Sequence, residues 1–560
     1  MKGEKKLKQN ESLAFSVRKL KKKVNKNKIL LDNISLDIKR NTLVAIIGPS
    51  GAGKTTFLKS LCDKEQFESG TISYYNQNGK LQETMPQFGY VPQENIIHEE
   101  LKLKEMLFYY AKLNLPKKTK NDEIYERIDE VLQDLDIKEC ENQIINSLSG
   151  GEKKRANMAA ELLRNPEYFF LDEPNTGLDP YTEKKLVETL KKLTNKNKTI
   201  IFVSHSLSFL DMCDQVIVIG KGGKLCFSGT TSEIKEFFND NNYINIYGKV
   251  QKETEKWQKK FTRINNISHW PNTKMKIKTA KKDTIYQFKI LTKRYIKLLL
   301  SDKKNLILLF LQAPVFALAI KSVTREGLYT LFWDTQEILF AFVCSGIWMG
   351  LFNSLREICK ELNIVKCETK NNVSLVSYIL SKLVVIGVIC LIQSITLVLG
   401  YSLLEKFPTK SIFTYPIVEI IISVFLITIT SSCMGLMFST LFKNQNRVMT
   451  IAPYLLIPHL LFSGVLYQLN DKLLILAKFI IGYWGTNALS ISSHLTELSS
   501  TEETIIGGQF DGMKFAPPLP EKAYITNNFQ CLIENWGALI FGSIIMSILC
   551  YYFLKRNVKD

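Results

Sequence analysis

The segment from Leu383 to Leu404 constrains the fold of this chain more than any other, because its 22 consecutive positions hold no charged residue. A helix of about 20 apolar residues is long enough to cross the hydrocarbon core of a bilayer. An uncharged run of this length is not typical of a soluble domain. The segment therefore predicts a membrane-spanning helix, and with it a membrane domain in this half of the chain.

Five more segments have the length and the apolar composition of membrane spans. The predicted spans are 305–320, 338–355, 383–404, 417–442, 448–467 and 536–554. The first is short and contains Gln312 and Pro314, so its bounds are the least defined. Together the spans predict an all-α six-helix transmembrane domain over residues 283–560. An even number of spans returns the chain to the side of the membrane on which it started.

Lys and Arg are distributed unequally between the loops of this topology. The inner segments carry 10 Lys or Arg in 38 residues and the outer segments carry 8 in 92, which is the bias expected when the inner loops face the cytoplasm. The start of the chain is charged and polar and has no signal-peptide core. We therefore expect an integral, multi-pass membrane protein whose two termini and N-terminal half are cytoplasmic. A helix over 284–300, with apolar residues at spacings of 3 and 4, is expected on the inner membrane surface.

The net charge of +19 raises the question of a nucleic-acid partner. The basic residues are dispersed, however, through a basic N-terminal arm (1–11), a Lys-rich linker (241–282) and the loops that flank the spans. A solvated surface that faces anionic membrane lipid accounts for this charge, so we expect no nucleic acid. The eleven cysteines include no CxxC pair, which indicates neither a zinc site nor a disulfide scaffold.

The N-terminal half contains a phosphate-binding motif in the required setting. The short apolar run from Leu43 to Ile47 is followed directly by GPSGAGKTT, a full GxxxxGK[ST] motif between a strand and a helix. Its glycines let backbone N–H groups surround phosphates, its lysine adds a positive charge and its first threonine offers a hydroxyl to Mg²⁺. The predicted ATP-binding residues are Gly48, Pro49, Ser50, Gly51, Ala52, Gly53, Lys54, Thr55 and Thr56.

A second apolar strand, 168–171, ends in the carboxylates Asp172 and Glu173. Such a pair beside a phosphate loop typically supplies a carboxylate on the Mg²⁺ side and a base for water. Asp172 is the predicted metal ligand and Glu173 the predicted base. A strand with a merely solvated acidic end is the alternative, and the phosphate loop in the same domain argues against it.

Residues 148–155 read LSGGEKKR, and the LSGGE core resembles the signature of ATP-binding cassette proteins. In that family the signature lies at a helix N-terminus and contacts the γ-phosphate of ATP held by the opposite subunit's phosphate loop. The resemblance carries this role to Ser149, Gly150 and Gly151, where the helix dipole favours an anion. One chain has one phosphate loop and one signature, so two chains are implied for two sites.

The remaining elements of the family follow in order as Gln93, Asp179 and His205. By this resemblance Gln93 senses Mg²⁺ and the attacking water and links to the membrane domain, while His205 hydrogen-bonds the γ-phosphate. The implied metal set is Thr55, Gln93 and Asp172, and the implied catalytic set is Glu173, His205 and Gln93. The chain departs from the family in one respect. Residues 17–28 lack the aromatic side chain that commonly stacks on adenine, and Phe15 is the nearest.

The cassette-first order, the signature and the six spans together resemble G-subfamily (White-type) half-transporters, and segments 89–98 and 356–362 are similar to bacterial relatives of that subfamily. The resemblance implies a multidomain chain, with an α/β P-loop ATP-binding cassette at 12–240 before the membrane domain. It implies an ATP- and Mg²⁺-dependent half-transporter that pairs with a second copy or close relative. The expected cargo is a lipophilic or amphipathic compound exported across a membrane.

Two other classes of function share part of this pattern. A soluble cassette ATPase that acts on ribosomes or DNA would lack membrane spans. A membrane ATPase that works as a mechanical or regulatory device without moving a solute shares every motif, so the sequence leaves that alternative open.

Features of the membrane half add further expectations. Segment 363–377 resembles the family's coupling helix, and 473–483 resembles a segment that dips back into the membrane or packs as a helix on the outer loop. Polar residues inside spans are functional candidates by default, and here they are Glu419, Gln393, Asn353 and His459. Glu419 is expected to be a solvated carboxylate at the outer interface. Cys531, alone in the last outer loop, is expected either as a free or buried thiol or as an intermolecular bridge.

Overall fold

The chain divides into two compact units, Met1–Lys281 and Lys282–Asp560. The computed structural model describes residues 13–24, 28–62, 65–76, 78–264, 283–324, 329, 332–405, 408, 410–413, 415–442, 444–467, 469–495, 497–498 and 528–559. The predicted basic arm and residues 265–282 of the predicted linker lie outside this set. The predicted multidomain fold, an α/β unit followed by a helical one, is confirmed.

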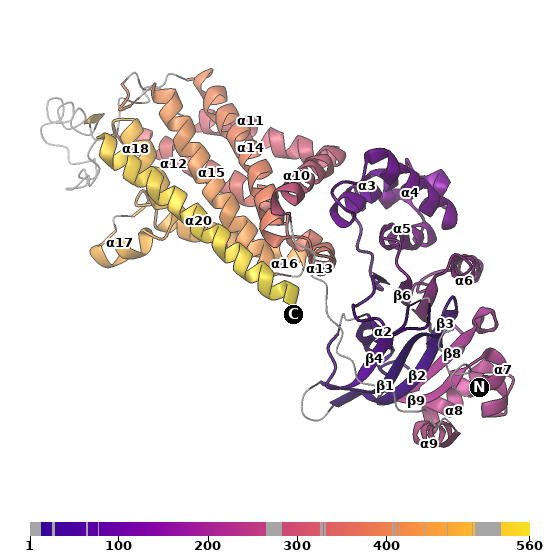
Figure 1. The fold of residues 1–560 in the computed structure, drawn as a ribbon. Helices are drawn as coiled ribbons and strands as arrows, with labels where there is room; N and C mark the ends of the chain where they lie inside the picture. Colours follow the sequence, from indigo (N-terminus) through magenta and orange to yellow (C-terminus); the bar gives the residue numbers. More distant parts are fainter. Residues whose placement is uncertain are drawn as a thin grey trace, which may run out of the picture. The chain divides into compact units, whose positions relative to one another are not determined.

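The first unit is built on a nine-stranded sheet of order β4-β1-β2-β9-β8-β3-β7-β6-β5 (Figure 1). Its strands are β1 Leu13–Val24, β2 Lys28–Lys39, β3 Leu43–Ile47, β4 Ser69–Tyr74, β5 Phe88–Val91, β6 Tyr168–Asp172, β7 Thr199–Val203, β8 Gln215–Gly220 and β9 Lys224–Gly229. Strands β8, β3, β7, β6 and β5 run parallel, while β1 pairs antiparallel with β2 and β4. The central strands β3, β6 and β7 are buried along their whole length, as expected for parallel strands covered on both faces.

Parallel strands end at the same edge of a sheet, and this edge positions the site. The carboxyl ends of β3, β6 and β7 carry Gly48, Glu173 and Ser204 respectively. Loops that leave adjacent parallel strands converge on one crevice. The motifs predicted from separate parts of the sequence therefore meet at one place.

Helices complete the first unit and extend it beyond the predicted boundary at 240. They are α2 Lys54–Leu61, α3 Leu103–Asn114, α4 Asn121–Asp134, α5 Gly150–Leu162, α6 Pro180–Thr194, α7 Thr231–Phe238, α8 Tyr243–Lys252 and α9 Thr254–Ile264, with short 3₁₀ turns η1 Lys138–Cys140, η2 Ile145–Ser147 and η3 Leu210–Met212. Trp257 and Phe261 of α9 are buried against Phe237 and Phe238. Residues 243–264 are thus part of the folded unit, because aromatic side chains spaced along a Lys-rich segment give it a buried face.

The second unit is a helical bundle centred on α15. Its helices are α10 Thr284–Ser301, α11 Lys303–Val323, α12 Phe332–Ser354, α13 Leu362–Lys370, α14 Leu375–Ser402, α15 Pro416–Leu441, α16 Gln445–Leu461, α17 Asp471–Ala477, α18 Ile481–Ser492 and α20 Phe529–Lys559, with the 3₁₀ turn η4 Cys359–Glu361. Helix α15 packs against α12, α14, α18 and α20. In its most apolar stretch 78% of the residues are buried, against 17% for α20. The bundle therefore presents most of α20 to its surroundings (Figure 1).

Five helices in the described part of the chain are long and apolar enough to cross a membrane, namely α11, α12, α14, α15 and α20. The predicted span 448–467 differs, because α16 ends at Leu461 after 17 residues and contains Pro453 and Pro458. Proline interrupts helix hydrogen bonding, which shortens the element below the ~20 residues of a full span. Helices α17 and α18 form a pair bent by 95°, and counting this pair as one span gives a sixth. The bend falls within the predicted dipping segment 473–483.

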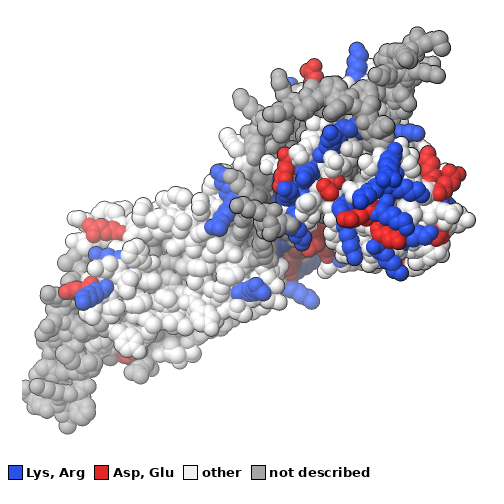
Figure 2. All heavy atoms as spheres, turned by 90° about the horizontal axis from the view of Figure 1, so that it is seen from below, with Lys and Arg blue, Asp and Glu red and all other residues white. Residues whose placement is uncertain are grey.

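The two units differ in their surfaces. Figure 2 shows basic and acidic side chains closely mixed on the visible face of the first unit, while the visible face of the bundle is almost free of them between its ends. An apolar surface of this extent is stable only in a lipid environment.

Candidate active site

The loop after β3 requires glycine where another residue would clash. Gly48 has a φ of +148°, and a Cβ there would lie 1.9 Å from the carbonyl oxygen of Ile219. Gly53 adopts a left-handed φ of +91° just before α2 begins. The turn directs the side chain of Lys54 back over the loop, where its Nζ donates to the carbonyl oxygens of Gly48 at 2.8 Å and Pro49 at 3.1 Å. The positive charge is thus held inside the loop.

Thr55 and Asp172 bring two oxygens together beside this loop. The Thr55 hydroxyl donates to Asp172 Oδ1 at 2.8 Å, and the Tyr90 hydroxyl donates to Oδ2 at 3.3 Å. Burial raises the pKa of Asp172, and the hydrogen bond from Thr55 acts in the opposite direction. Burial also lowers the pKa of Lys54, while the nearby carboxylates of Glu173 and Asp172 act to raise it. Hydroxyl and carboxylate oxygens are hard ligands that suit Mg²⁺, so the Thr55 and Asp172 pair fits this ion.

The carboxylate of Glu173 contacts the two other residues that were predicted to be catalytic, His205 and Gln93. Its Oε1 lies 2.8 Å from His205 Nε2, and its Oε2 accepts from Gln93 Nε2 at 3.0 Å. The Thr176 hydroxyl donates to the same Oε2 at 3.2 Å. The Glu173 side chain is 14% exposed, and its backbone has a left-handed φ of +52°. The structure therefore places Gln93 with Glu173, whereas the sequence assigned it both to the base and to the metal pair.

The signature residues form the start of α5. Ser149 is the N-cap, and its hydroxyl accepts from the Glu152 backbone amide at 3.4 Å while its own amide donates to Glu152 Oε2 at 2.8 Å. This capping box fixes the helix end. Ser149 and Gly150 are exposed, and Gly151 is buried, where a Cβ would lie 2.6 Å from Thr182 Cγ2. Within the described residues, no hydrogen bond joins 149–151 to the phosphate loop of the same chain.

Asp179 caps the next helix. Its Oδ1 accepts from the backbone amides of Tyr181 and Thr182, each at 3.1 Å, at the start of α6. The Asp179 carboxylate therefore caps the helix, and among the described residues it shares no hydrogen bond with Glu173 or Asp172.

Two contacts at this site were not predicted from the sequence. Lys154, inside the signature segment, donates to the carbonyl oxygen of Gln93, and burial lowers the pKa of Lys154. The Tyr247 hydroxyl of α8 donates to the Gly48 carbonyl at 3.4 Å. Phe15, the nearest aromatic before the phosphate loop, is fully buried against Tyr74 and Tyr168 and is not available to a nucleotide base. Only the long-range fold brings 154 and 247 to these partners, so a local pattern could not reveal them.

Comparison with known proteins gives the same two-part division. A family model described as ABC transporter matches residues 31–176, and one described as ABC-2 type transporter matches residues 286–492. The chain belongs to the ABC transporters. Its ATP-binding domain precedes its membrane domain.

The relatives of this ABC transporter include members named for the G family. The chain is 27% identical over 464 residues to an ABC transporter ATP-binding/permease protein of Mycobacterium tuberculosis, an alignment that covers 80% of this chain and 54% of the relative. It is 24% identical over 493 residues to the protein white of Ceratitis capitata, covering 78% of this chain and 71% of the relative. It is 34% identical over 225 residues to ABC transporter G family member 21 of Arabidopsis thaliana, covering 39% and 33%. The alignments thus span about half of the first of these relatives and a third of the last.

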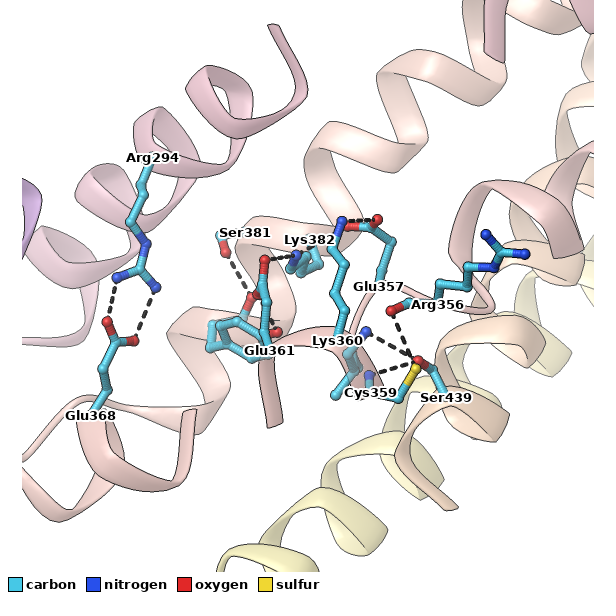
Figure 3. A network of polar contacts seen from close by, with 12 residues as sticks. Arg294, Arg356, Glu357, Cys359, Lys360, Glu361, Glu368, Ser381, Lys382 and Ser439 are labelled. Atoms are coloured by element: carbon cyan, nitrogen blue, oxygen red, sulfur yellow. Dashed lines mark hydrogen bonds and ion pairs between the residues drawn. The ribbon is translucent and has the colours of Figure 1, made fainter. Parts of the chain in front are cut away.

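The membrane domain of this transporter contains a buried ionic network between α10, α13, α14 and the segment 357–361 that includes η4 (Figure 3). Lys382 is 2% exposed, and its Nζ donates to Glu357 Oε2 at 3.1 Å and Glu361 Oε1 at 3.0 Å. Arg294 forms a two-pronged pair with Glu368, with Nη2 2.9 Å from Oε2. These contacts tie the amphipathic helix α10 to the segment that resembles a coupling helix.

Neighbouring groups balance the charge of this network. Lys360 pairs with Glu357, so that three cations face three carboxylates. The Tyr295 ring centroid lies 3.8 Å from Lys382 Nζ, and the Tyr378 hydroxyl donates to Glu361 at 2.7 Å. Paired and hydrogen-bonded charges are the form in which ions are stable away from water. Helix α14 starts at Leu375, before the predicted span at 383, and Ser374 caps it by accepting from the Ser377 amide.

The four polar residues predicted as functional inside spans each hydrogen-bond within the membrane domain. Asn353 Nδ2 donates to Gln393 Oε1 at 2.6 Å, and Gln393 Nε2 donates to the carbonyl of Leu309 at 2.7 Å. Glu419 is fully buried, and its Oε1 accepts from the backbone amides of residues 412 and 413 at 3.1 and 2.6 Å. The predicted solvated carboxylate is therefore wrong, because backbone donors replace water. His459 is 5% exposed, and its Nδ1 accepts from the Gly482 amide at 3.4 Å.

Proposed function

We propose that this chain is one half of a dimeric, ATP-hydrolysing transporter that moves a lipophilic or amphipathic compound across a membrane, in the direction of export. The observation that carries the proposal is the convergence on Glu173. Donors from Gln93 and His205 hold this carboxylate at the sheet edge that also carries the phosphate loop. A carboxylate so placed can accept a proton from water that attacks a phosphate in the loop.

The roles of the neighbouring residues follow from their chemistry. Lys54 and the backbone N–H groups of 50–56 would bind the β- and γ-phosphates. Thr55 and Asp172 would hold Mg²⁺, which when bound neutralises phosphate charge. Gln93 would orient the attacking water and His205 would hydrogen-bond the γ-phosphate. Thr55 lies within hydrogen-bond distance of Asp172, and Gln93 and His205 lie within hydrogen-bond distance of Glu173.

Two chains are needed to complete the proposed sites. Ser149 and Gly150 are exposed at the N-terminus of α5, where backbone amides and the helix dipole favour an anion. Their own chain's phosphate loop makes no hydrogen bond to them among the described residues. A second copy or a close relative would bring its ATP to this helix end.

Coupling to the membrane is proposed to run from the Gln93 region to residues 363–377. The pairing of Arg294 with Glu368 braces that segment on α10. A braced segment transmits displacement instead of absorbing it. In the proposed arrangement the cassette at 12–240, its extension through α9 and both termini are cytoplasmic, consistent with the excess of Lys and Arg on that side.

Transport into vesicles tests the proposal directly. Proteoliposomes that contain the full chain, with its ATP-binding domain outside, are supplied with ATP, Mg²⁺ and a panel of fluorescent lipids and lipophilic dyes. ATP-dependent accumulation that is absent with Glu173→Gln supports the proposal. ATP hydrolysis without movement of any member of a broad panel indicates instead a membrane ATPase that works as a mechanical device.

A further inference from the structure

A groove of about 570 Å³ runs along the outside of the membrane domain between α14, α15 and α20. Its size is within the ~300–1,000 Å³ typical of small-molecule pockets. Val376, Leu380 and Gly387 line one wall, and Ser547 and Tyr551 line the other. The Ser547 hydroxyl donates to the carbonyl of residue 543 at 2.8 Å. Because this donor is already used within α20, the lining offers an occupant mainly apolar contacts. The groove therefore suits a hydrocarbon occupant.

The length of the groove identifies which hydrocarbon. The α14 wall runs from Val376 to Gly387, which is about 16 Å at 1.5 Å per residue and about half of the ~30 Å hydrocarbon core. One leaflet of the bilayer has this depth. A spanning helix from a second copy of the chain would extend through both leaflets, whereas the acyl chain of one phospholipid extends through one.

One end of the groove carries a positive charge. Lys555 follows Tyr551 by one helical turn on the same face of α20, and its Nζ lies 5.6 Å from the centre of the Tyr551 ring. The Lys555 side chain is exposed. Tyrosine is favoured at the headgroup level of a bilayer, and lysine there attracts anionic lipid. This end of α20 lies beside the end of α15, since Asn557 donates to the carbonyl of Thr440.

We propose that the groove binds one acyl chain of an anionic phospholipid, and that the phosphate of this lipid pairs with Lys555. The lipid would be a resident of the membrane domain, independent of the transported compound. The apolar lining accounts for the chain, the one-leaflet length for a single phospholipid, and the charge at the end for its anionic headgroup.

Competition between two lipids tests the headgroup contact. The purified full chain is incubated with phosphatidylglycerol and phosphatidylcholine, and bound lipids are counted by native mass spectrometry. The wild type is expected to favour phosphatidylglycerol, and Lys555→Ala is expected to lower this preference about fivefold. Arg556→Ala removes a charge from an exposed position one residue away, off the groove face, and is expected to leave the preference unchanged. An equal loss in both variants would overturn the assignment to Lys555.

Filling the groove tests the acyl-chain contact. Val384→Trp, at a groove position that is 48% exposed, is expected to abolish retention of both lipids. Ile392→Trp, 42% exposed on the same helix beyond the groove, is the matched control. Thermal unfolding monitors folding, and Gly387→Leu is a second filling variant, because a Cβ there meets only Ile429 Cδ1 at 3.6 Å. Unchanged lipid counts in folded variants, or a changed dimer fraction instead of a changed lipid count, would overturn the proposal.

Discussion

Polar groups in the ATP-binding domain and in the membrane domain are used in opposite ways. Around Glu173, donors and acceptors from three strand ends converge at a partly exposed edge. Around Lys382, the charges are buried and balanced within one chain. The first arrangement, the open site around Glu173, leaves room for a charged ligand. In the second, the closed network around Lys382, the charged groups are already paired with one another.

This difference explains where specificity for charge can reside. The charged groups of a buried network that already pair with one another are not available to bind a cargo. The same holds for the side-chain amides of Asn353 and Gln393, which bond to each other. A compound would therefore find no unpaired charge in either cluster. The proposed lipophilic cargo is consistent with this distribution of polar groups.

The sharpest test of the open site is Glu173→Gln. Removing the carboxylate while keeping its shape is expected to lower ATP turnover by about 10²- to 10⁴-fold, the scale of losing a general base. ATP binding should persist, because the phosphate loop is untouched. Steady-state hydrolysis and nucleotide binding measure the two effects separately. Retention of more than about a tenth of the wild-type rate would be inconsistent with a base at this position.

The closed network is tested by Lys382→Met. The variant leaves Glu357 and Glu361 buried without their shared cation, which is expected to lower the free energy of unfolding by about 3–5 kcal/mol. Lys360→Met, at a side chain that is 28% exposed, is the control, with an expected loss below about 1 kcal/mol. Unfolding in detergent is the measurement. Similar losses in both variants would show that Lys382 is not the centre of the network.

The ratio of ATP affinity to GTP affinity tests the effect of the missing aromatic side chain at the open site. With Phe15 buried and no aromatic side chain at 17–28, stacking worth about 1 kcal/mol is missing, or about fivefold in affinity. GTP is expected to compete with ATP within about tenfold. Competition binding to the full chain provides the ratio. A preference for ATP above about a hundredfold would mean that another group reads the base.

Mixed dimers test whether the open site needs a partner while the closed network does not. A Ser149→Arg chain paired with a Lys54→Ala chain keeps one intact site if the signature acts on the partner's ATP. In the Glu173→Gln background such dimers are expected to retain one ATP per dimer, and dimers of either single variant none. No ATP in the mixed dimers would place the signature with its own phosphate loop.

The sequence was most informative where function depends on local patterns. The phosphate loop, Asp172, Glu173 and His205 lie beside strand ends, and parallel pairing brings strand ends together. The first and sixth predicted spans fall inside α11 and α20 because apolar length is a property of the segment itself.

Long-range pairs could not be predicted in this way. Arg294 and Glu368 are 74 residues apart, and each alone has the pattern of a solvated charge on an amphipathic helix. Glu419 was predicted as solvated because nothing in its own helix indicates that the amides of 412 and 413 turn back onto it. Helix α16 was predicted too long because hydropathy outweighed Pro453 and Pro458.

The left-handed backbone conformation of Glu173 lowers the stability of the fold, while its side chain is needed for the proposed activity. A side chain at φ +52° costs about 1 kcal/mol that glycine would not incur. Glycine at this position would therefore relax the turn, and it would also remove the carboxylate between Gln93 and His205. Selection for a more stable fold would favour glycine at this position, whereas selection for ATP turnover would favour glutamate. A chain freed from the need to hydrolyse ATP would be expected to lose this glutamate early.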